Sequence, residues 1–197
     1  LEHTSLKLCA YIKTNIKTMI DLQGKNPKLL VVGDLMIDHY LWGSCERISP
    51  EAPVQVVNID RESMVLGGAG NVINNLKALG AEVEVISAIG DCKVSNELVQ
   101  LLNDLGVSTK FLITEKGRIS SKKTRVIASQ QQVVRYDRET TNDIDSHSED
   151  AIISILQNNI RNYKIILLSD YGKGVLTDKI TKSIIQLANQ NDIKVLV

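Results

Sequence analysis

The apolar residues of the chain follow two alternating patterns. Short continuous apolar runs, typical of strands buried on both faces of a parallel sheet, occur at 29–34, 81–91, 164–170 and 193–197. Segments with apolar residues at helical spacing occur at 69–79, 94–105, 147–160 and 177–190. Because strands and helices alternate, we expect βαβ units and an α/β fold with a mostly parallel sheet flanked by helices.

Local signals set the ends of these helices. Gly80 and Gly106 stop the first two, as glycine does after a helical segment. Ser146 and Glu149 form a capping box that opens the third helix. Thr177 caps the fourth, which continues through 190.

Two stretches have β character and no intervening helix. The first contains predicted strands at 54–60 and 64–66, and the second spans 122–137 and is expected to be a hairpin. Alternation in that hairpin puts Arg135 and Asp137 on one face. A short strand is also expected at 111–113. The simplest interpretation is one α/β domain with a small β excursion built from two separated stretches.

The ends of the chain suggest a piece of a longer protein. Residues 1–27 carry apolar side chains at roughly helical spacing and predict an N-terminal amphipathic helix that packs on the domain or on a second subunit. The chain does not begin with Met, and it ends in the apolar run 193–197. We therefore expect the domain of 28–197 to be truncated at its C-terminus and to continue beyond Val197.

Composition excludes several classes of function. Lys plus Arg and Asp plus Glu both number 23, so the chain lacks the basic excess of a nucleic-acid binder. No apolar run approaches the roughly 20 residues of a membrane span. Cys9, Cys45 and Cys92 have neither metal nor redox spacing, which indicates a reducing, cytoplasmic location. We expect no metal site, no nucleic-acid partner and no membrane partner.

Acidic residues follow three of the predicted strands, at Asp34, Asp91 and Asp170. Ligands of parallel sheets bind beyond the carboxyl ends of the strands, although a single such Asp is more often a turn former. Asp38 follows Asp34 closely, which gives two neighbouring carboxylates. Carboxylates suit sugar hydroxyls because each accepts several hydrogen bonds.

Glycines open the first helix at Gly67, Gly68 and Gly70. The cluster lets backbone N–H groups approach a ligand, or it makes a tight turn with close helix packing. It matches neither the dinucleotide fingerprint nor a Walker A loop. Asn71 either reaches a bound hydroxyl or caps the helix.

Two further segments carry charges in constrained positions. Lys173 lies between two glycines after a buried strand, where it either neutralises a phosphate or is a solvated loop residue. Arg47 and Glu51 lie beside the two prolines of RISPEAPV, which hold both side chains in place or form a rigid connector.

Taken in order, VVGDLMID, RISPEAPV, LGGAGNVINNLKALGA, QQVVRYD and LLSDYGKGVLT resemble the ribokinase-like (PfkB) carbohydrate kinases, and among them the heptose 7-phosphate kinases. The resemblance runs from about Lys28 to Val197. It implies a ribokinase-like α/β domain with a small β-sheet lid, here near 41–66 and 120–138. Because such lids often form dimer interfaces, it also implies a homodimer.

The resemblance implies a role for each candidate residue. The sugar hydroxyls would be bound by Asp34 and Asp38, in a site lined by Gly67, Gly68 and Asn71. Charged and polar residues would close the site or meet a phosphate: Arg47, Glu51, Gln132, Arg135, Asp170 and Lys173. The family usually has a glycine near the position where this chain has Ser95.

The implied reaction is phosphoryl transfer from ATP with Mg²⁺ to the anomeric hydroxyl of heptose 7-phosphate, giving the 1,7-bisphosphate used for lipopolysaccharide core sugars. The Gly-Ala-Gly-Asp stretch that supplies the family's catalytic Asp does not occur after Asp170. We therefore expect these residues to hold the sugar half of the site and to be inactive alone. No His-rich signature of a fused adenylyltransferase occurs.

Three alternatives remain. The first is a kinase of the same fold for another sugar, such as ribose, fructose or a nucleoside. The second is a non-catalytic sugar-binding or dimerising protein. A dinucleotide-dependent oxidoreductase is the weakest, because the glycine fingerprint fails.

Overall fold

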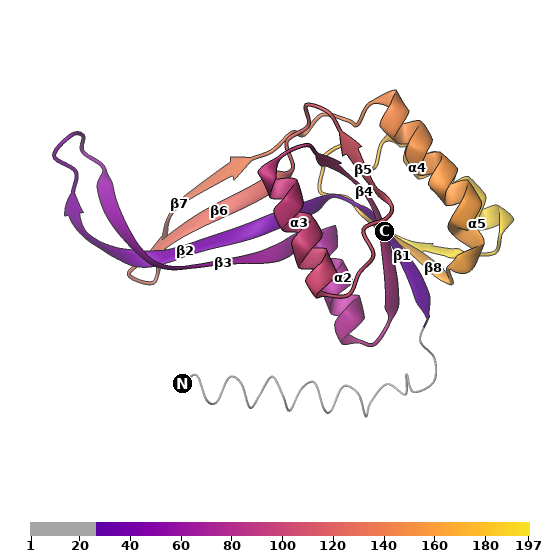
Figure 1. The fold of residues 1–197 in the computed structure, drawn as a ribbon, viewed down its shortest axis with the longest axis horizontal. Helices are drawn as coiled ribbons and strands as arrows, with labels where there is room; N and C mark the ends of the chain where they lie inside the picture. Colours follow the sequence, from indigo (N-terminus) through magenta and orange to yellow (C-terminus); the bar gives the residue numbers. More distant parts are fainter. Residues whose placement is uncertain (1–26) are drawn as a thin grey trace.

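The computed structural model describes residues 27–197, so the helix expected within 1–27 lies almost entirely outside the described residues. The described chain forms an α/β body from which a long, thin β-sheet extends to one side (Figure 1). None of the helices in this range combines the length and the apolar character needed to cross a bilayer.

The body is built on sheet A, which has five parallel strands in the order β5-β4-β1-β8-β9. Its strands are β1 (Lys28–Gly33), β4 (Glu82–Gly90), β5 (Leu112–Glu115), β8 (Ile165–Ser169) and β9 (Lys194–Leu196). The flanking helices are α2 (Ala69–Ala78), α3 (Lys93–Asp104), α4 (Ser146–Asn159) and α5 (Asp178–Gln190), with the short 3-10 turn η1 (Ile160–Asn162) after α4. The prediction of an α/β fold with a mostly parallel sheet flanked by helices is confirmed.

Each face of sheet A has its own apolar core, because alternate residues of a strand point to opposite faces. Leu30 and Val32 of β1 belong to the core that contains α4 and α5. Val31, between them, belongs to the core that contains α2 and α3. The continuous apolar run 29–34 is therefore explained by burial on both sides.

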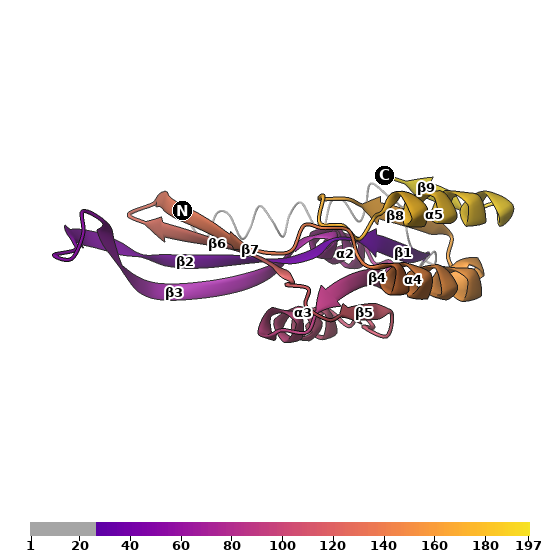
Figure 2. The same ribbon diagram turned by 90° about the horizontal axis from the view of Figure 1, so that it is seen from above.

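The extended arm is sheet B, a single layer with the strand order β3-β2-β6-β7 (Figure 2). Its strands are β2 (Leu35–Ile48), β3 (Gln55–Gly68), β6 (Ser121–Ala128) and β7 (Gln131–Arg138). β2 pairs antiparallel with β3 and parallel with β6, and β6 pairs antiparallel with β7. Two separated β stretches thus join in one sheet, which we call the lid sheet.

Several local predictions need correction. The runs 54–60 and 64–66 belong to one continuous strand, β3, and β2 starts immediately after Asp34. The capping box at Ser146 is wrong, because Asp145 is the N-cap of α4 and accepts the Ser148 N–H at 2.7 Å. The cap at Thr177 is confirmed, since its hydroxyl accepts the Ile180 N–H at 3.3 Å.

Candidate functional site

The candidate site lies where the carboxyl ends of the sheet A strands meet the base of the lid sheet. Gly33 at the end of β1 pairs with Ser169 at the end of β8, and the Asp34 N–H donates to the Ser169 carbonyl at 3.1 Å. β2 leaves the body directly after Asp34, while β3 returns at Gly68 and leads into α2. The Ala69 N–H donates to the Asp34 carbonyl at 2.9 Å, so the α2 N-terminus adjoins the end of β1.

The Asp34 carboxylate is buried and is held by backbone N–H groups. Its side chain is 1% exposed and accepts backbone N–H groups from Tyr171 at 2.8 Å, Lys173 at 3.0 Å and Val175 at 3.2 Å. These donors all belong to the loop that follows β8. Asp34 therefore binds the loop around Lys173, which differs from the role at a sugar hydroxyl expected for it.

Asp38, unlike Asp34, is accessible to a ligand, as was expected of both carboxylates. It lies on β2 at the base of the lid sheet, is partly exposed, and accepts a hydrogen bond from the Arg125 guanidinium at 2.5 Å. A Cβ on Gly67 would collide with the carboxylate, so glycine is what leaves room for it. Asp38 and Gly67 are thus brought together from adjacent strands.

The residues after Gly67 begin helix α2 beside this pair. Gly68 is the N-cap of α2 and has φ 56°, a left-handed conformation that favours glycine. Its Cβ, if present, would also collide with Met36 and the Asp34 backbone. Asn71 is exposed in the first turn of the helix and is not the N-cap.

Charged side chains connect the loop that follows β8 with the lid sheet. The Lys173 ammonium contacts Glu139 at 2.6 Å, and the second oxygen of Glu139 contacts Lys123 at 3.2 Å. Lys123 also contacts Asp137 at 3.1 Å, and Asp137 binds Arg135 at 2.6 Å. We call this chain of ion pairs the lid ladder.

Strand pairing puts the ladder on the same face as Asp38. Asp38 lies beside Lys123, Lys123 opposite Asp137, and Arg125 opposite Arg135. The expected common face of Arg135 and Asp137 is therefore confirmed. A register shift between Val126 and Ile127 makes Gln132 the partner of Ile127, two residues beyond Arg125, so Gln132 also joins this face.

The lid ladder shifts the pKa values of its carboxyl groups. The hydrogen bond from Arg135 and the nearby Lys123 hold the pKa of Asp137 far below its usual range. Partial burial acts to raise the pKa of Glu139, but hydrogen bonds from Lys173 and Lys123 outweigh it and lower that pKa. Both groups are therefore anionic at neutral pH.

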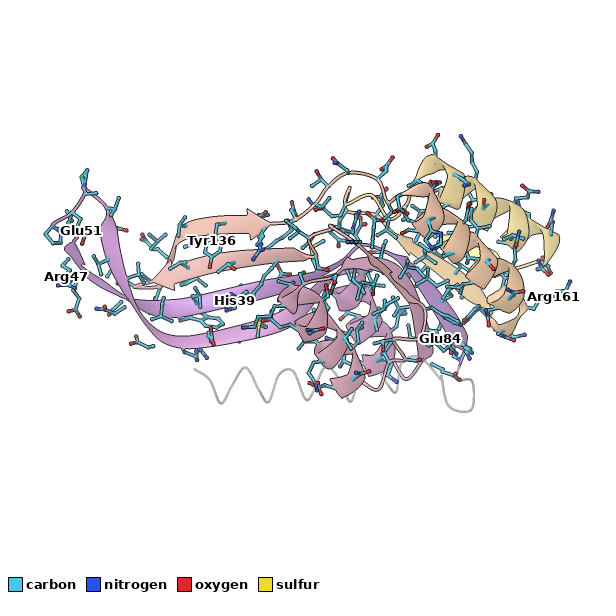
Figure 3. All side chains as sticks on the ribbon, turned by 45° about the horizontal axis from the view of Figure 1, so that its top comes forward. His39, Arg47, Glu51, Glu84, Tyr136 and Arg161 are labelled. Atoms are coloured by element: carbon cyan, nitrogen blue, oxygen red, sulfur yellow. The ribbon has the colours of Figure 1, made fainter. Side chains whose placement is uncertain are left out.

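Not every candidate residue reaches this site. Arg47 and Glu51 are exposed at the far tip of the arm formed by β2 and β3, well away from the body (Figure 3). Asp170 is exposed, and its carboxylate accepts the Gly172 N–H at 2.8 Å, the geometry of a turn former. Within the one chain described, these three residues do not converge with Asp38.

Sequence reasoning missed four charged residues of the site: Lys123, Arg125, Glu139 and Arg118. Lys123 and Arg125 carried a usable signal, since they alternate in the strand paired with Arg135 and Asp137. Arg118 carried none, because its position in a loop does not reveal that its guanidinium is buried. Ser95 is also buried, and its hydroxyl contacts the Gly90 carbonyl and the Ser120 hydroxyl at the base of the lid.

Comparison with known proteins identifies the class. The model of the pfkB family carbohydrate kinases matches residues 26–197, and the chain belongs to this family. It is 64% identical over 173 residues to the bifunctional protein HldE of Aliarcobacter butzleri, and 55% identical over 169 residues to that of Campylobacter fetus. These matches cover 88% and 86% of the chain but only 36% of either relative, so the chain spans about a third of their length.

Solved structures agree on the fold. A carbohydrate kinase from Agrobacterium tumefaciens matches with a TM-score of 0.63 at 18% identity, covering 86% of this chain and 52% of that one. The ribokinase of Arabidopsis thaliana, solved with ribose and ATP, matches with a TM-score of 0.58 at 15% identity, covering 86% and 52%. The predicted ribokinase-like fold is confirmed.

Proposed function

We propose that this chain forms the acceptor-sugar half of a kinase that transfers a phosphoryl group from ATP to the anomeric hydroxyl of heptose 7-phosphate, giving heptose 1,7-bisphosphate for lipopolysaccharide core synthesis. The observation that carries the proposal is the open Asp38 carboxylate beside Gly67, on the same lid face as several cations. The 64% identity to a bifunctional HldE protein supports heptose over other sugars.

Asp38 is proposed to bind the sugar hydroxyls. A carboxylate accepts several O–H donors at once, and here one oxygen is already oriented by Arg125 at 2.5 Å. Gly67, Gly68 and Asn71 would line the same site, because α2 begins beside Asp38. Such fixed positions favour catalysis by orientation, which supplies much of the acceleration in phosphoryl transfer.

The phosphate of the acceptor is proposed to meet the cations around the lid ladder. Arg125 and Arg135 come from opposed positions of β6 and β7, and Lys173 approaches from the body. Guanidinium groups suit phosphate because they offer several N–H donors in a fixed plane. Gln132 extends the same face, whereas Arg47 and Glu51 would act only if another subunit brought them near.

ATP and Mg²⁺ belong to the proposal for the whole enzyme. Among residues 27–197, no group of three or more His, Cys, Asp or Glu side chains is arranged to hold a metal ion. Mg²⁺ is usually held by substrate phosphates and water with one or two carboxylates, so in the whole enzyme it would bind together with ATP. Use of ATP is consistent with a cytoplasmic enzyme.

A sugar-binding experiment on the full-length protein tests the proposal. Titration calorimetry with heptose 7-phosphate, unphosphorylated heptose and ribose should give the tightest binding for the phosphorylated heptose. Asp38→Ala should weaken all three, because it removes the hydroxyl acceptor. Equal affinity for heptose with and without phosphate would reject the phosphate assignment, and unchanged affinity of Asp38→Ala would reject the hydroxyl site.

We also propose that the lid sheet pairs two copies of the chain through its second face. Val134, Tyr136 and Met64 lie on the face opposite Asp38 and are 48%, 54% and 36% exposed. Light scattering should give a dimer that Val134→Glu dissociates. Ile185→Glu, on the exposed side of α5, is the matched control and should leave the dimer intact. A monomeric wild type would contradict this part.

A further inference from the structure

The loop after β8 is held by two buried charged side chains of opposite sign. Asp34 is 1% exposed and Arg118 is 6% exposed, so both are largely removed from water. A buried charge is costly unless it is paired and hydrogen-bonded. The partners of Asp34 are all backbone groups of 171–175, and Arg118 also reaches this loop.

Both charges converge on a single peptide segment. The Asp34 carboxylate accepts the Lys173 N–H at 3.0 Å, and the Arg118 guanidinium donates to the Lys173 carbonyl. Arg118 donates in addition to the Asn142 carbonyl at 3.2 Å, which links the loop to the segment that follows the lid. The backbone of Lys173 is therefore fixed on both sides.

Glycines allow the loop to approach these partners. Gly172 and Gly174 flank Lys173 and have φ 64° and 83°, both in the left-handed region. A Cβ on Gly174 would collide with the Asn142 backbone. The loop thus bends tightly around Lys173, whose ammonium is left beside Glu139 at 2.6 Å.

Holding the backbone in place restricts where a lysine can put its charge. Its side chain is a flexible four-carbon stem, so the position of its charge depends on how firmly the backbone is held. We infer that Asp34 and Arg118 are positioning residues that clamp the Lys173 backbone and aim its ammonium at the phosphate of the acceptor sugar. The inference rests on the proposed function for the identity of that phosphate, and it assigns Asp34 no contact with the sugar.

The clamp makes a specific prediction for binding by the full-length protein. Lys173→Met should weaken the binding of heptose 7-phosphate by about 10- to 100-fold, the usual effect of losing a charged hydrogen bond. The affinity for unphosphorylated heptose should not change. Asp34→Asn should give this same selective loss. The double variant should be no weaker than Lys173→Met alone, because both changes remove one interaction.

Controls separate this role from general damage. Asp104→Asn makes the same chemical change at an exposed position at the end of α3 and should leave both affinities unchanged. If Asp34→Asn fails to fold, Arg118→Lys is the second variant, since a lysine keeps the charge but cannot serve all the acceptors. The clamp would be overturned if Asp34→Asn weakened the binding of both sugars equally. It would also be overturned if the loss of affinity in the double variant were the sum of the two single losses.

A readout without sugar keeps the inference separate from the proposed function. Reductive methylation followed by mass spectrometry measures how accessible the Lys173 ammonium is, and Asp34→Asn should raise its labelling rate severalfold. Labelling of Lys116, on an exposed loop, should not change. If the wild type shows no preference for phosphorylated sugar, the proposed function fails; if Lys173 labelling is unaffected by Asp34→Asn, the clamp fails.

Discussion

Gly67 defines part of the site by lacking a side chain. Its missing Cβ leaves the space into which the Asp38 carboxylate projects. The three atoms nearest to an added Cβ belong to the Asp38 and Met36 side chains, so an added methyl group would first displace side chains and not the backbone. Gly67 therefore affects the orientation of Asp38 more than the fold.

Gly67→Ala should lower sugar affinity by about tenfold or more, because Asp38 must turn away from its hydrogen-bonding position. The free energy of unfolding should fall by only about 1–3 kcal/mol, the usual cost of one extra carbon in a packed site. Titration calorimetry and urea unfolding measure the two effects.

Gly70→Ala is the matched control for that change, because the atoms nearest to its added Cβ all belong to the Leu66 side chain and none to Asp38. It should reduce stability while sugar affinity stays near that of the wild type. In an Asp38→Ala background, Gly67→Ala should have little further effect on affinity. A full additional loss there would mean that Gly67 acts independently of Asp38.

Asp34 and Asp38 show what sequence could not decide at this scale. Both carboxylates follow the same apolar run, so spacing alone makes them equally good candidates for binding a ligand. The donors that occupy Asp34 lie about 140 residues further along the chain, as its bond to the Lys173 N–H shows. Only tertiary structure brings that loop to Asp34, whereas Asp38 lies beyond its reach on the lid.

At the scale of single elements, the N-terminus of α4 gives a sharp test. Asp145→Ala should lower the melting temperature by a few degrees, because it removes the acceptor for the Ser148 N–H. Ser146→Ala should have little effect, since Ser146 is exposed and lies one residue inside the helix. A larger fall in melting temperature for Ser146→Ala than for Asp145→Ala would support the capping box instead. Thermal unfolding followed by circular dichroism measures both.

Helices and parallel strands were predictable because burial imposes a regular pattern. α2, α3 and α5 begin and end within a residue or so of the predicted positions, where Gly80, Gly106 and Thr177 mark them. β2 was missed because its register with β3 shifts twice, after Trp42 and again after Cys45. The first shift leaves Asp60 of β3 without a partner residue and the second leaves Glu46 of β2 without one, so the alternation changes phase once in each strand.

At the scale of the whole molecule, the lid ladder links the arm to the body. Glu139 follows β7 and contacts one lysine from each part, Lys173 at 2.6 Å and Lys123 at 3.2 Å. The presence of a lid followed from the resemblance and from the two helix-free stretches. Its length did not, and the tip that carries Arg47 and Glu51 lies far from the site expected for these residues (Figure 3).

Glu139 should make the stability of the protein depend on pH. Its pKa is lowered in the folded state from an ordinary value of 4.5, because hydrogen bonds from Lys173 and Lys123 outweigh the effect of burial. A lowered folded pKa means that the stabilisation is fully present above about pH 4.5 and is lost as pH falls through the folded value. Wild type should therefore exceed Glu139→Gln in melting temperature at pH 7, and the difference should shrink below pH 4.5.

The comparison between the two proteins isolates Glu139 from other acids. Glu84 and Asp145 also have lowered pKa values, but they lie outside the lid ladder, so they titrate alike in wild type and variant and cancel in the difference. Asp137 shares Lys123 with Glu139, but its pKa in the folded state is held far below its usual range, so it keeps its charge there across the pH range of the test. A difference in melting temperature that stays constant from pH 7 to pH 3 would show that Glu139 stabilises the protein without its charge, and that the ladder does not join lid and body electrostatically.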